Sequence, residues 1–394
     1  MINLSESSSN PFKEFFDSER NSGIILLCCV IAALIMANSP LQDFYFGILK
    51  HKIGIVFDDF VLRKSIEHWI NDGLMTVFFF LVGLEIKREV IKGELSSFQQ
   101  SSLPISAALG GMAIPALIFY LFNGGDETAR GWAIPMATDI AFALGILSLL
   151  GNRVPNSLRV FLAALAIADD LGAILVIAIF YTSQVVWTNL FVSGMMFLLL
   201  LLLNRLGVRN QMVYLAVGTF LWYFVYKSGV HATVAGVLAA IAIPVKGNAG
   251  ESLLEDLEHL LHKPVNYFIM PIFALANTGV ILESHAIDGF GSPLSMGIFL
   301  GLLVGKPLGI VTFSWILVKT RISMLPENAD WRHICGVGFL AGIGFTMSIF
   351  ISLLSFQQAE HQTVAKISIL VASVASGLAG FIILRRTKNI DLTR

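Results

Sequence analysis

Two adjacent aspartates lie in the middle of an apolar stretch of this sequence. The segment LAIADDLGAILV, residues 165–176, contains Asp169 and Asp170, and residues 160–187 hold no other charged side chain. Ionisable residues inside an apolar segment normally face a helix-bundle interior or a wet cavity, where they mark an ion or proton path. The pair is therefore the first candidate for chemistry.

Three further ionisable residues lie in similar surroundings. Asp139 occurs in GWAIPMATDIAFALG, Lys306 in GLLVGKPLGI and His231 in SGVHATVAG. Each charged group in the middle of a bilayer costs about 2.5–3.5 kcal/mol on insertion scales. Three aspartates face one lysine, so up to two negative charges must bind protons, bind cations or meet water.

A purely structural alternative is a buried ion-pair network that only fixes helix packing. Apolar replacements of such networks are often neutral or stabilising, which favours a functional reading of Asp139, Asp169, Asp170 and Lys306. For His231 a satisfied packing histidine explains the sequence equally well.

The aspartate pair suits the exchange of a cation for protons. Adjacent residues on a helix point about 100° apart, so one carboxylate is expected to face a cavity and the other a neighbouring helix. Carboxylate and carbonyl oxygens suit hard cations such as Na⁺ or Li⁺, and a proton can take the same oxygens. No phosphate loop or nucleotide motif occurs, so we expect no drive by ATP.

The composition is that of a polytopic membrane protein. Hydrophobic residues make up 56% and charged residues 13%, with a mean hydropathy of +0.77, whereas soluble domains carry about 25% charge. The net charge of −1 gives no indication of nucleic-acid binding. The three cysteines lack metal-ligand and disulfide spacing, which indicates packing.

Long continuous apolar runs favour membrane helices over a barrel. The sequence therefore predicts one all-α integral membrane domain over residues 1–394 with twelve transmembrane helices. The expected spans are 23–42, 69–84, 104–123, 132–151, 160–182, 186–204, 211–226, 229–245, 265–282, 294–318, 334–355 and 367–384.

Lysine and arginine bias predicts the orientation. The terminal segments and even-numbered loops hold eighteen of these residues and the odd-numbered loops seven. The N-terminal segment 1–22 and the tail 385–394 are therefore expected in the cytoplasm, and the first apolar run is expected to be a retained helix. Residues 43–68 form an outer loop whose alternating pattern weakly predicts a hairpin, for packing or for dimer contact.

Spans four and eleven are rich in helix-breaking residues. Span four has Gly131, Pro135 and Gly145, and span eleven reads GVGFLAGIGFTMSIF. One interpretation is close helix packing through glycine; the other is that both helices unwind in mid-membrane, where Asp139 and Lys306 would balance the helix-end charges. Spans 3–5 and 10–12 would then be inverted repeats, because their offset of seven spans is odd.

Five motifs in order resemble the NhaA family of bacterial Na⁺/H⁺ antiporters. They are ATDIAFALG, ALAIADDLGAI, SGVHATVAGV, GKPLGI and GIGFTMSIFI. The resemblance runs from about residue 23 to the last helix. It implies a twelve-helix inner-membrane protein, usually a homodimer, in which helices four and eleven are unwound and cross. It also implies electrogenic exchange of Na⁺ or Li⁺ for protons, without enzymatic activity and without a cofactor.

The resemblance assigns roles to individual residues. Asp169 and Asp170 would be the cation and proton carboxylates, with Asp170 the direct cation ligand and Asp169 free to pair with Lys306. Asp139 and Thr138 would lie at the helix crossing, where Thr138 lends an oxygen.

The resemblance also implies activation at alkaline pH by a cytoplasmic cluster. The matching positions lie in VGLEIKREV and LEHLLH, and they are Glu85, Arg88, Glu89, Glu258, His259 and His262. A departure from the family pattern precedes LEHLLH, where Glu251, Glu255 and Asp256 replace basic residues. These acids are expected to raise the pKa of nearby histidines, and an ordinary solvated loop is the alternative to a pH sensor.

Other functions share some of these features. An intramembrane aspartyl protease also uses two aspartates, but in Tyr-Asp and Gly-x-Gly-Asp settings. A retinal pigment pairs a membrane lysine with an aspartate, which twelve spans and GKPLG disfavour. A passive cation channel lacks the inverted repeat expected of a carrier.

Overall fold

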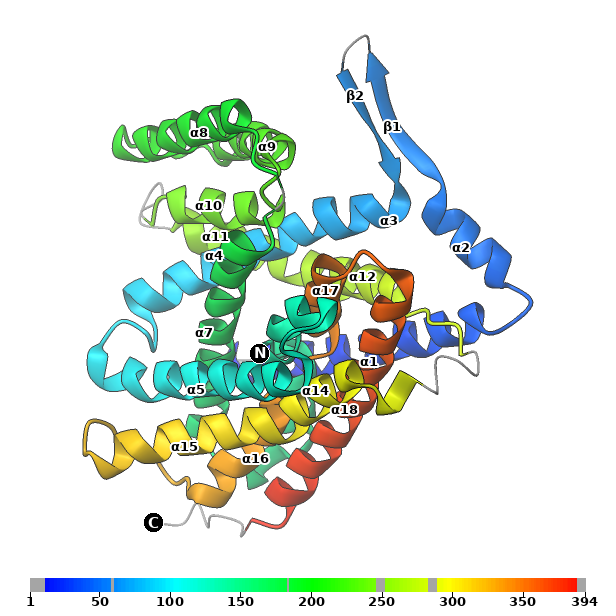
Figure 1. Cartoon of the computed structure of the whole chain (residues 1–394). Helices are drawn as coiled ribbons and strands as arrows, with labels where there is room; N and C mark the ends of the chain where they lie inside the picture. Colours follow the sequence, from blue (N-terminus) through cyan, green and yellow to red (C-terminus); the bar gives the residue numbers. More distant parts are fainter. Residues whose placement is uncertain (1–10, 58–59, 183, 246–251, 283–288, 388–394) are drawn as a thin grey trace, which may run out of the picture.

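The chain is mostly helical in the computed structural model, which describes residues 11–57, 60–182, 184–245, 252–282 and 289–387 (Figure 1). The α-helices are α1 Pro11–Ala37, α2 Gln42–Lys50, α3 Ile66–His68, α4 Met75–Lys92, α5 Phe98–Asn123, α6 Ile140–Leu149, α7 Asn156–Phe180, α8 Trp187–Arg205, α9 Gln211–Ser228, α10 Thr233–Ala242, α11 Leu253–Pro264, α12 Met270–Asn277, α14 Pro293–Leu300, α15 Lys306–Lys319, α16 Trp331–Ala341, α17 Phe345–Ser355 and α18 Ala359–Arg385. Short π-helical segments are η1 Trp69–Leu74, η5 Val265–Ile269 and η7 Gly301–Gly305; 3-10 segments are η2 Glu127–Met136, η3 Gly151–Arg153 and η6 Gly289–Gly291.

Helices able to cross a membrane are present. Six helices of the described chain are long and apolar enough, or eight if two bent pairs each count as one span. The chain is thus a mostly helical protein with the helices of a membrane protein, and the figure of twelve spans stays a prediction. Several helices start earlier than the apolar runs, α1 at Pro11 and α18 at Ala359, because helical hydrogen bonding continues into polar residues that hydropathy does not count.

A two-stranded hairpin projects from the helical bundle (Figure 1). Strands β1, Lys52–Phe57, and β2, Phe60–Ser65, pair antiparallel. The indole of Trp69 donates to the carbonyl of Ile53 at 3.0 Å, and this bond attaches the hairpin to the start of η1. The segment predicted as a loop with a hairpin, 43–68, thus also contains α2 and α3.

Two helical segments are interrupted. Three irregular residues, ending at Asp139, separate η2 from α6; Pro135 favours this because proline has no N–H for a helical bond and crowds the preceding turn. Gly342 and Gly344 lie at the break between α16 and α17, which meet at 46°. The breaks create free helix ends inside the protein.

Glycines let two helix pairs pack backbone to backbone. A Cβ on Gly309 of α15 would lie 2.0 Å from the carbonyl oxygen of Gly110 in α5, and one on Gly236 of α10 would lie 2.4 Å from the carbonyl of Thr76 in α4. Figure 1 shows α5 and α15 side by side. Such small-residue contacts are typical of membrane helix packing.

The hydrophobic interior is divided between two clusters. The larger includes residues of α1, α4, α5, α6, α7, α12, α14, α15, α16, α17 and α18, and the smaller includes residues of α4, α8, α9, α10 and α11. Figure 1 shows α8 and α9 as a pair at the edge of the molecule. The interrupted segments therefore lie within the larger, more deeply packed body.

Candidate functional site

Asp169 lies in a buried cluster of polar groups. Its Oδ2 atom accepts hydrogen bonds from Lys306 Nζ at 2.7 Å and from Thr138 Oγ1 at 2.6 Å. Lys306 is fully buried and also donates to the carbonyl of Met136, the last residue of η2. A lysine at a helix C-terminus offsets the negative end of the helix dipole. One ammonium therefore serves a carboxylate and a helix end together.

Asp170 points away from this cluster, in keeping with the 100° between adjacent helical residues. It is 4% exposed and lines a cavity of about 400 Å³. Within the described chain, Asp169 Oδ1 and Asp170 Oδ1 are both buried without a hydrogen-bond partner. A buried carboxylate oxygen without a donor is costly, so these two oxygens are the site's free capacity for a proton or a cation.

Asp139 caps two helices at once. Its Oδ1 accepts from the backbone N–H of Phe142 at 3.2 Å, near the start of α6. Its Oδ2 accepts from the backbone N–H of Thr346 at 3.0 Å and from the Thr346 hydroxyl at 2.5 Å, near the start of α17. Carboxylates are stabilising at helix N-termini because of the unpaired N–H groups there.

The two interruptions are joined directly by hydrogen bonds. The backbone N–H of Asp139 donates to the carbonyl of Ile343 at 2.6 Å, and the hydroxyl of Thr138 donates to the carbonyl of Ala341 at 2.9 Å. Thr138 therefore contacts both the end of α16 and Asp169. The structure brings Thr138, Asp139, Asp169 and Lys306 into one assembly, with Asp170 on its cavity side.

The cavity leads from Asp170 towards a cluster of charged residues. Its wall is formed by α4, α6, α7, α11 and η5, and it is largely apolar near Asp170. Besides Asp170, the charged and polar lining residues are Glu85, Arg88, Glu89, Glu94, Arg159, Glu258, His262 and Asn266. Five of the six positions in the predicted cytoplasmic cluster thus line the cavity that holds Asp170. His259, the sixth, is exposed and is absent from the lining.

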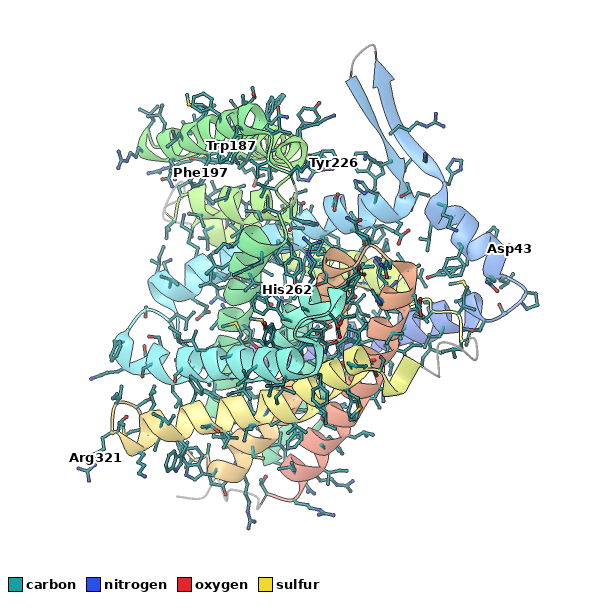
Figure 2. All side chains as sticks on the ribbon, in the orientation of Figure 1. Asp43, Trp187, Phe197, Tyr226, His262 and Arg321 are labelled. Atoms are coloured by element: carbon teal, nitrogen blue, oxygen red, sulfur yellow. The ribbon has the colours of Figure 1, made fainter. Side chains whose placement is uncertain are left out.

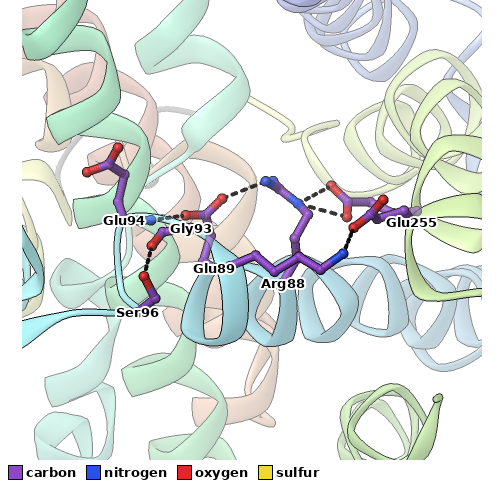
Figure 3. A network of polar contacts seen from close by, with 8 residues as sticks. Arg88, Glu89, Gly93, Glu94, Ser96 and Glu255 are labelled. Carbon is purple, nitrogen blue, oxygen red and sulfur yellow. Dashed lines mark hydrogen bonds and ion pairs between the residues drawn. The ribbon is translucent and has the colours of Figure 1, made fainter. Parts of the chain in front are cut away.

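Ion pairs connect α4 to α11 at this cluster (Figure 3). Arg88 contacts Glu89 at 2.8 Å and Glu258 at 2.9 Å, and Lys92 contacts Glu255 at 2.6 Å. Of the acids noted as a departure in the sequence, Glu255 is therefore paired with a lysine on the facing helix. Asp256 is exposed on α11, and Glu251 lies outside the described residues.

Burial shifts the pKa of Glu258 and of Lys87, which both lie outside the expected transmembrane spans. Burial raises the pKa of the Glu258 carboxyl above its ordinary value, although Arg88 opposes the shift. Burial also lowers the pKa of Lys87 to about 8. The Lys87 ammonium donates to the carbonyls of Ile241, at 2.5 Å, and Ile243 at the end of α10.

His231 lies apart from the cavity of Asp170. Its Nδ1 contacts the Thr233 hydroxyl at 2.9 Å, its Nε2 lies 3.7 Å from Asp72, and its ring meets the edge of Phe350 at 5.5 Å between centroids. His68 also contacts Asp72, at 3.0 Å. The Nδ1 atom therefore has a hydroxyl partner, and Nε2 faces the Asp72 carboxylate.

Sequence reasoning missed three residues of the site. Thr346 donates to Asp139, and the signal was a hydroxyl two residues after the last glycine of span eleven. Arg159 lines the cavity, and its signal was a cation at the edge of span five. Lys87 carried no signal, because its carbonyl partners on α10 are distant in sequence.

Comparison with known proteins agrees with the resemblance. Residues 13–384 match the family described as Na⁺/H⁺ antiporter 1. The chain is 55% identical over 374 residues to Na(+)/H(+) antiporter NhaA 2 of Flavobacterium johnsoniae, covering 95% of this chain and 92% of that one. It is 50% identical to Na(+)/H(+) antiporter NhaA of Flavobacterium psychrophilum, covering 95% of each chain, and 49% identical to Na(+)/H(+) antiporter NhaA 1 of Clostridium beijerinckii, covering 96% of each. The predicted resemblance is thus confirmed, and the chain belongs to the Na⁺/H⁺ antiporter 1 family.

Proposed function

We propose that the protein is an electrogenic antiporter that exchanges cytoplasmic Na⁺ or Li⁺ for external protons and so regulates intracellular pH and sodium. The relatives are named as Na⁺/H⁺ antiporters, which supports Na⁺/H⁺ exchange as the activity. The observation that carries the site assignment is that Asp169 and Asp170 each hold a buried oxygen without a hydrogen-bond partner in the described chain.

Cation and protons compete for the same oxygens in this proposal. Asp170 binds the cation directly, Asp169 takes part as second carboxylate, and Thr138 lends a hydroxyl oxygen. Hard oxygen donors favour Na⁺ and Li⁺, and a protonated carboxylate loses its attraction for a cation. If both carboxylates take protons but hold one monovalent ion, each cycle moves net charge, which makes the exchange electrogenic.

Lys306 has two possible parts in the cycle. It either releases its proton when Asp169 turns to sodium, or it stays charged and holds Asp169 and the end of η2 in place. Asp139 compensates the helix ends on the other side of the break. The number of protons released per ion by a Lys306→Gln variant separates the two roles, since only a proton-carrying lysine changes that number.

Transport proceeds by alternating access. The cavity beside Asp170 ends at the charged cluster of α4 and α11, which supports a cytoplasm-facing state. In this state the carboxylates lose protons and take Na⁺. The inverted repeats, spans 3–5 and 10–12 with crossing helices four and eleven, then rock and expose the site to the outside, where Na⁺ leaves and protons enter.

The charged cluster on the cavity wall regulates activity with pH. Histidine changes charge in the neutral range, and His262 lines the cavity together with Glu85. Arg88 joins Glu89 to Glu258 across two helices, so a charge change there alters how α4 meets α11. Two further histidines are candidates for pH sensing. They are His259 on α11 and His231, which lies near Asp72 just before the start of α4.

The protein is proposed to be a twelve-span homodimer of the bacterial inner membrane with both termini in the cytoplasm. The lysine and arginine bias supports the orientation, which puts the α11 side in the cytoplasm and the hairpin outside. A hairpin has free strand edges that can pair with a second copy, which supports dimer contact through residues 43–68. No cofactor is needed, since the transported ions are the only small partners besides lipid.

Proton release on adding Na⁺, Li⁺ or K⁺ to reconstituted protein, at about pH 6 to 9, tests this function. Asp170→Asn should abolish sodium-dependent proton release, because an amide neither releases a proton nor attracts the cation. Asp126→Asn is the matched control, since Asp126 is exposed and lies outside the cavity lining. Full proton release by Asp170→Asn would refute the site, and the absence of uphill sodium flux in the wild type would refute the carrier.

A further inference from the structure

A buried hydroxyl beside the break between α16 and α17 has no partner. Ser376 of α18 is fully buried, and its Oγ atom makes no hydrogen bond within the described chain. Buried helical serines usually donate to a carbonyl about one turn back in their own helix, as Ser352, Ser355 and Ser368 do here. A buried polar group without a partner is costly, so Ser376 requires an explanation.

Ser376 lies directly against this break. A Cβ on Gly342, the residue that caps the end of α16, would lie 2.9 Å from Ser376 Oγ and 2.5 Å from the carbonyl oxygen of Leu302. The hydroxyl and the carbonyl therefore approach the same backbone carbon, and a glycine leaves room for both. One donor and one acceptor thus flank the break, with no side chain of residue 342 between them.

The Leu302 carbonyl lacks its helical donor. Leu302 lies in the π-helical turn η7, where the N–H of Lys306 donates to the carbonyl of Gly301, five residues back. The next donor in this pattern would be residue 307, which is a proline and has no N–H. Figure 2 shows Arg321, just past the end of α15, at the edge of the molecule, so η7 is the inner end of this helix, where Leu302 is fully buried.

Helix α18 already supplies one hydroxyl to the break. Ser373, one turn before Ser376, accepts a hydrogen bond from the backbone N–H of Phe345 at 3.2 Å, at the start of α17. Helix α18 therefore holds the α17 side of the break through Ser373, whereas Ser376 meets the α16 side, at Gly342, without a bond. Glycine adapts its backbone readily, so the unbonded side is the one that can move.

We propose that Ser376 is a positioning residue of the transport cycle, whose hydroxyl donates to the Leu302 carbonyl in the state open to the outside. The inference rests on the proposed alternating access. In the cytoplasm-facing state both groups stay unpaired, which raises the free energy of this state. A small shift of the break joins them, because each already lies next to Gly342. The new hydrogen bond then stabilises the outward-open state, from which Na⁺ leaves.

The test compares two apparent Na⁺ affinities of the full-length protein, measured from either side of the membrane in right-side-out and inside-out vesicles. Apparent affinity scales with the population of the state that accepts the ion, so the ratio of the two reports the equilibrium between the states. A neutral hydrogen bond changes an equilibrium about fivefold. Ser376→Ala should therefore shift the ratio about fivefold towards the cytoplasmic side. Its Tm should not fall, because the cytoplasm-facing state loses no bond.

Ser368→Ala is the matched control, since Ser368 is fully buried on the same helix but bonds to the Val364 carbonyl and to the Ser295 hydroxyl. It should lower Tm and keep the wild-type ratio. An unchanged ratio in Ser376→Ala, or the same shift in both variants, would overturn the proposal. So would an equal fall in Tm, because the Ser376 hydroxyl would then already have a partner. The absence of uphill sodium flux in the wild type would instead refute the exchange on which the proposal rests.

Discussion

Replacing Asp139 by asparagine should destabilise the protein strongly, because this one carboxylate caps two helices. Its two oxygens accept from the backbone of Phe142, from the backbone of Thr346 and from the hydroxyl of Thr346. Asparagine has one acceptor oxygen, and its NH₂ group is a donor. The substitution therefore turns a donor–acceptor contact into a donor–donor contact at one of the two helix starts.

The size of the effect follows from these contacts. Loss of one N-cap costs about 1 kcal/mol, and a buried N–H left without an acceptor costs about 1–3 kcal/mol. Loss of negative charge beside two helix N-termini adds about 0.3–1 kcal/mol for each. Because contributions within one network do not add fully, we expect a loss of about 3 kcal/mol in the free energy of unfolding.

Thermal unfolding of the detergent-purified protein measures this loss. At about 2 °C per kcal/mol for a large domain, Asp139→Asn should lower Tm by about 6 °C at a fixed scan rate. The control is Asp330→Asn, because Asp330 caps only α16, through the N–H groups of Arg332 and His333, and its side chain is 61% exposed. The control should lose at most about 1 kcal/mol. Equal shifts in the two variants would refute the double cap.

Three further changes test other parts of the structure. Thr138→Val removes the donor to Asp169 and should weaken the apparent Na⁺ affinity in proton release at least tenfold, since a bond to a charged group contributes about 1.5–3 kcal/mol; Thr138→Ser should preserve it. Gly309→Ala, whose Cβ would meet the carbonyl of Gly110, should cost about 2 kcal/mol of stability by overpacking, and an unchanged Tm would contradict the close approach. Burial lowers the pKa of Lys87 to about 8, so between about pH 8 and 10 the unfolded chain binds more protons at Lys87 than the folded chain, and wild-type stability must rise with pH there. The difference in Tm between wild type and Lys87→Met, measured at about pH 7 and at about pH 10, should shift in favour of wild type as the pH rises. The same difference at both pH values would exclude this effect.

The sequence was most informative where a residue type was out of place. Charged side chains in apolar runs pointed to Asp139, Asp169, Asp170 and Lys306, because the cost of burying a charge does not depend on the details of the fold. Helix periodicity alone required Asp169 and Asp170 to face different surroundings. Glycine and proline content indicated the interruptions of spans four and eleven, since these residues act on the local backbone.

Contacts between distant helices were beyond the sequence. The pairing of Lys92 with Glu255 joins residues that each looked like ordinary loop charges. The different positions of His259 and His262 depend on the rotation of α11, because, of these two histidines, only His262 lines the cavity. The close approach of Gly309 in α15 to Gly110 in α5 likewise joins residues that are distant in the sequence.

The interrupted helices explain why Asp170, and neither Asp139 nor Asp169, lines the cavity. The sequence presents three membrane aspartates and one lysine, so the charges cannot cancel by pairing alone. In the structure the N–H groups at the starts of α6 and α17 satisfy Asp139, and Lys306 pairs with the Oδ2 atom of Asp169. The capping of Asp139 requires the breaks, because an unbroken helix has no free N–H groups in its middle. One carboxylate then remains without a permanent basic partner, and it is the one that lines the cavity. The helix breaks and Lys306 thus together give the three aspartates different partners. A continuous helix in place of the α16–α17 break should remove the N–H groups that cap Asp139 and leave the pairing of Asp169 with Lys306 in place.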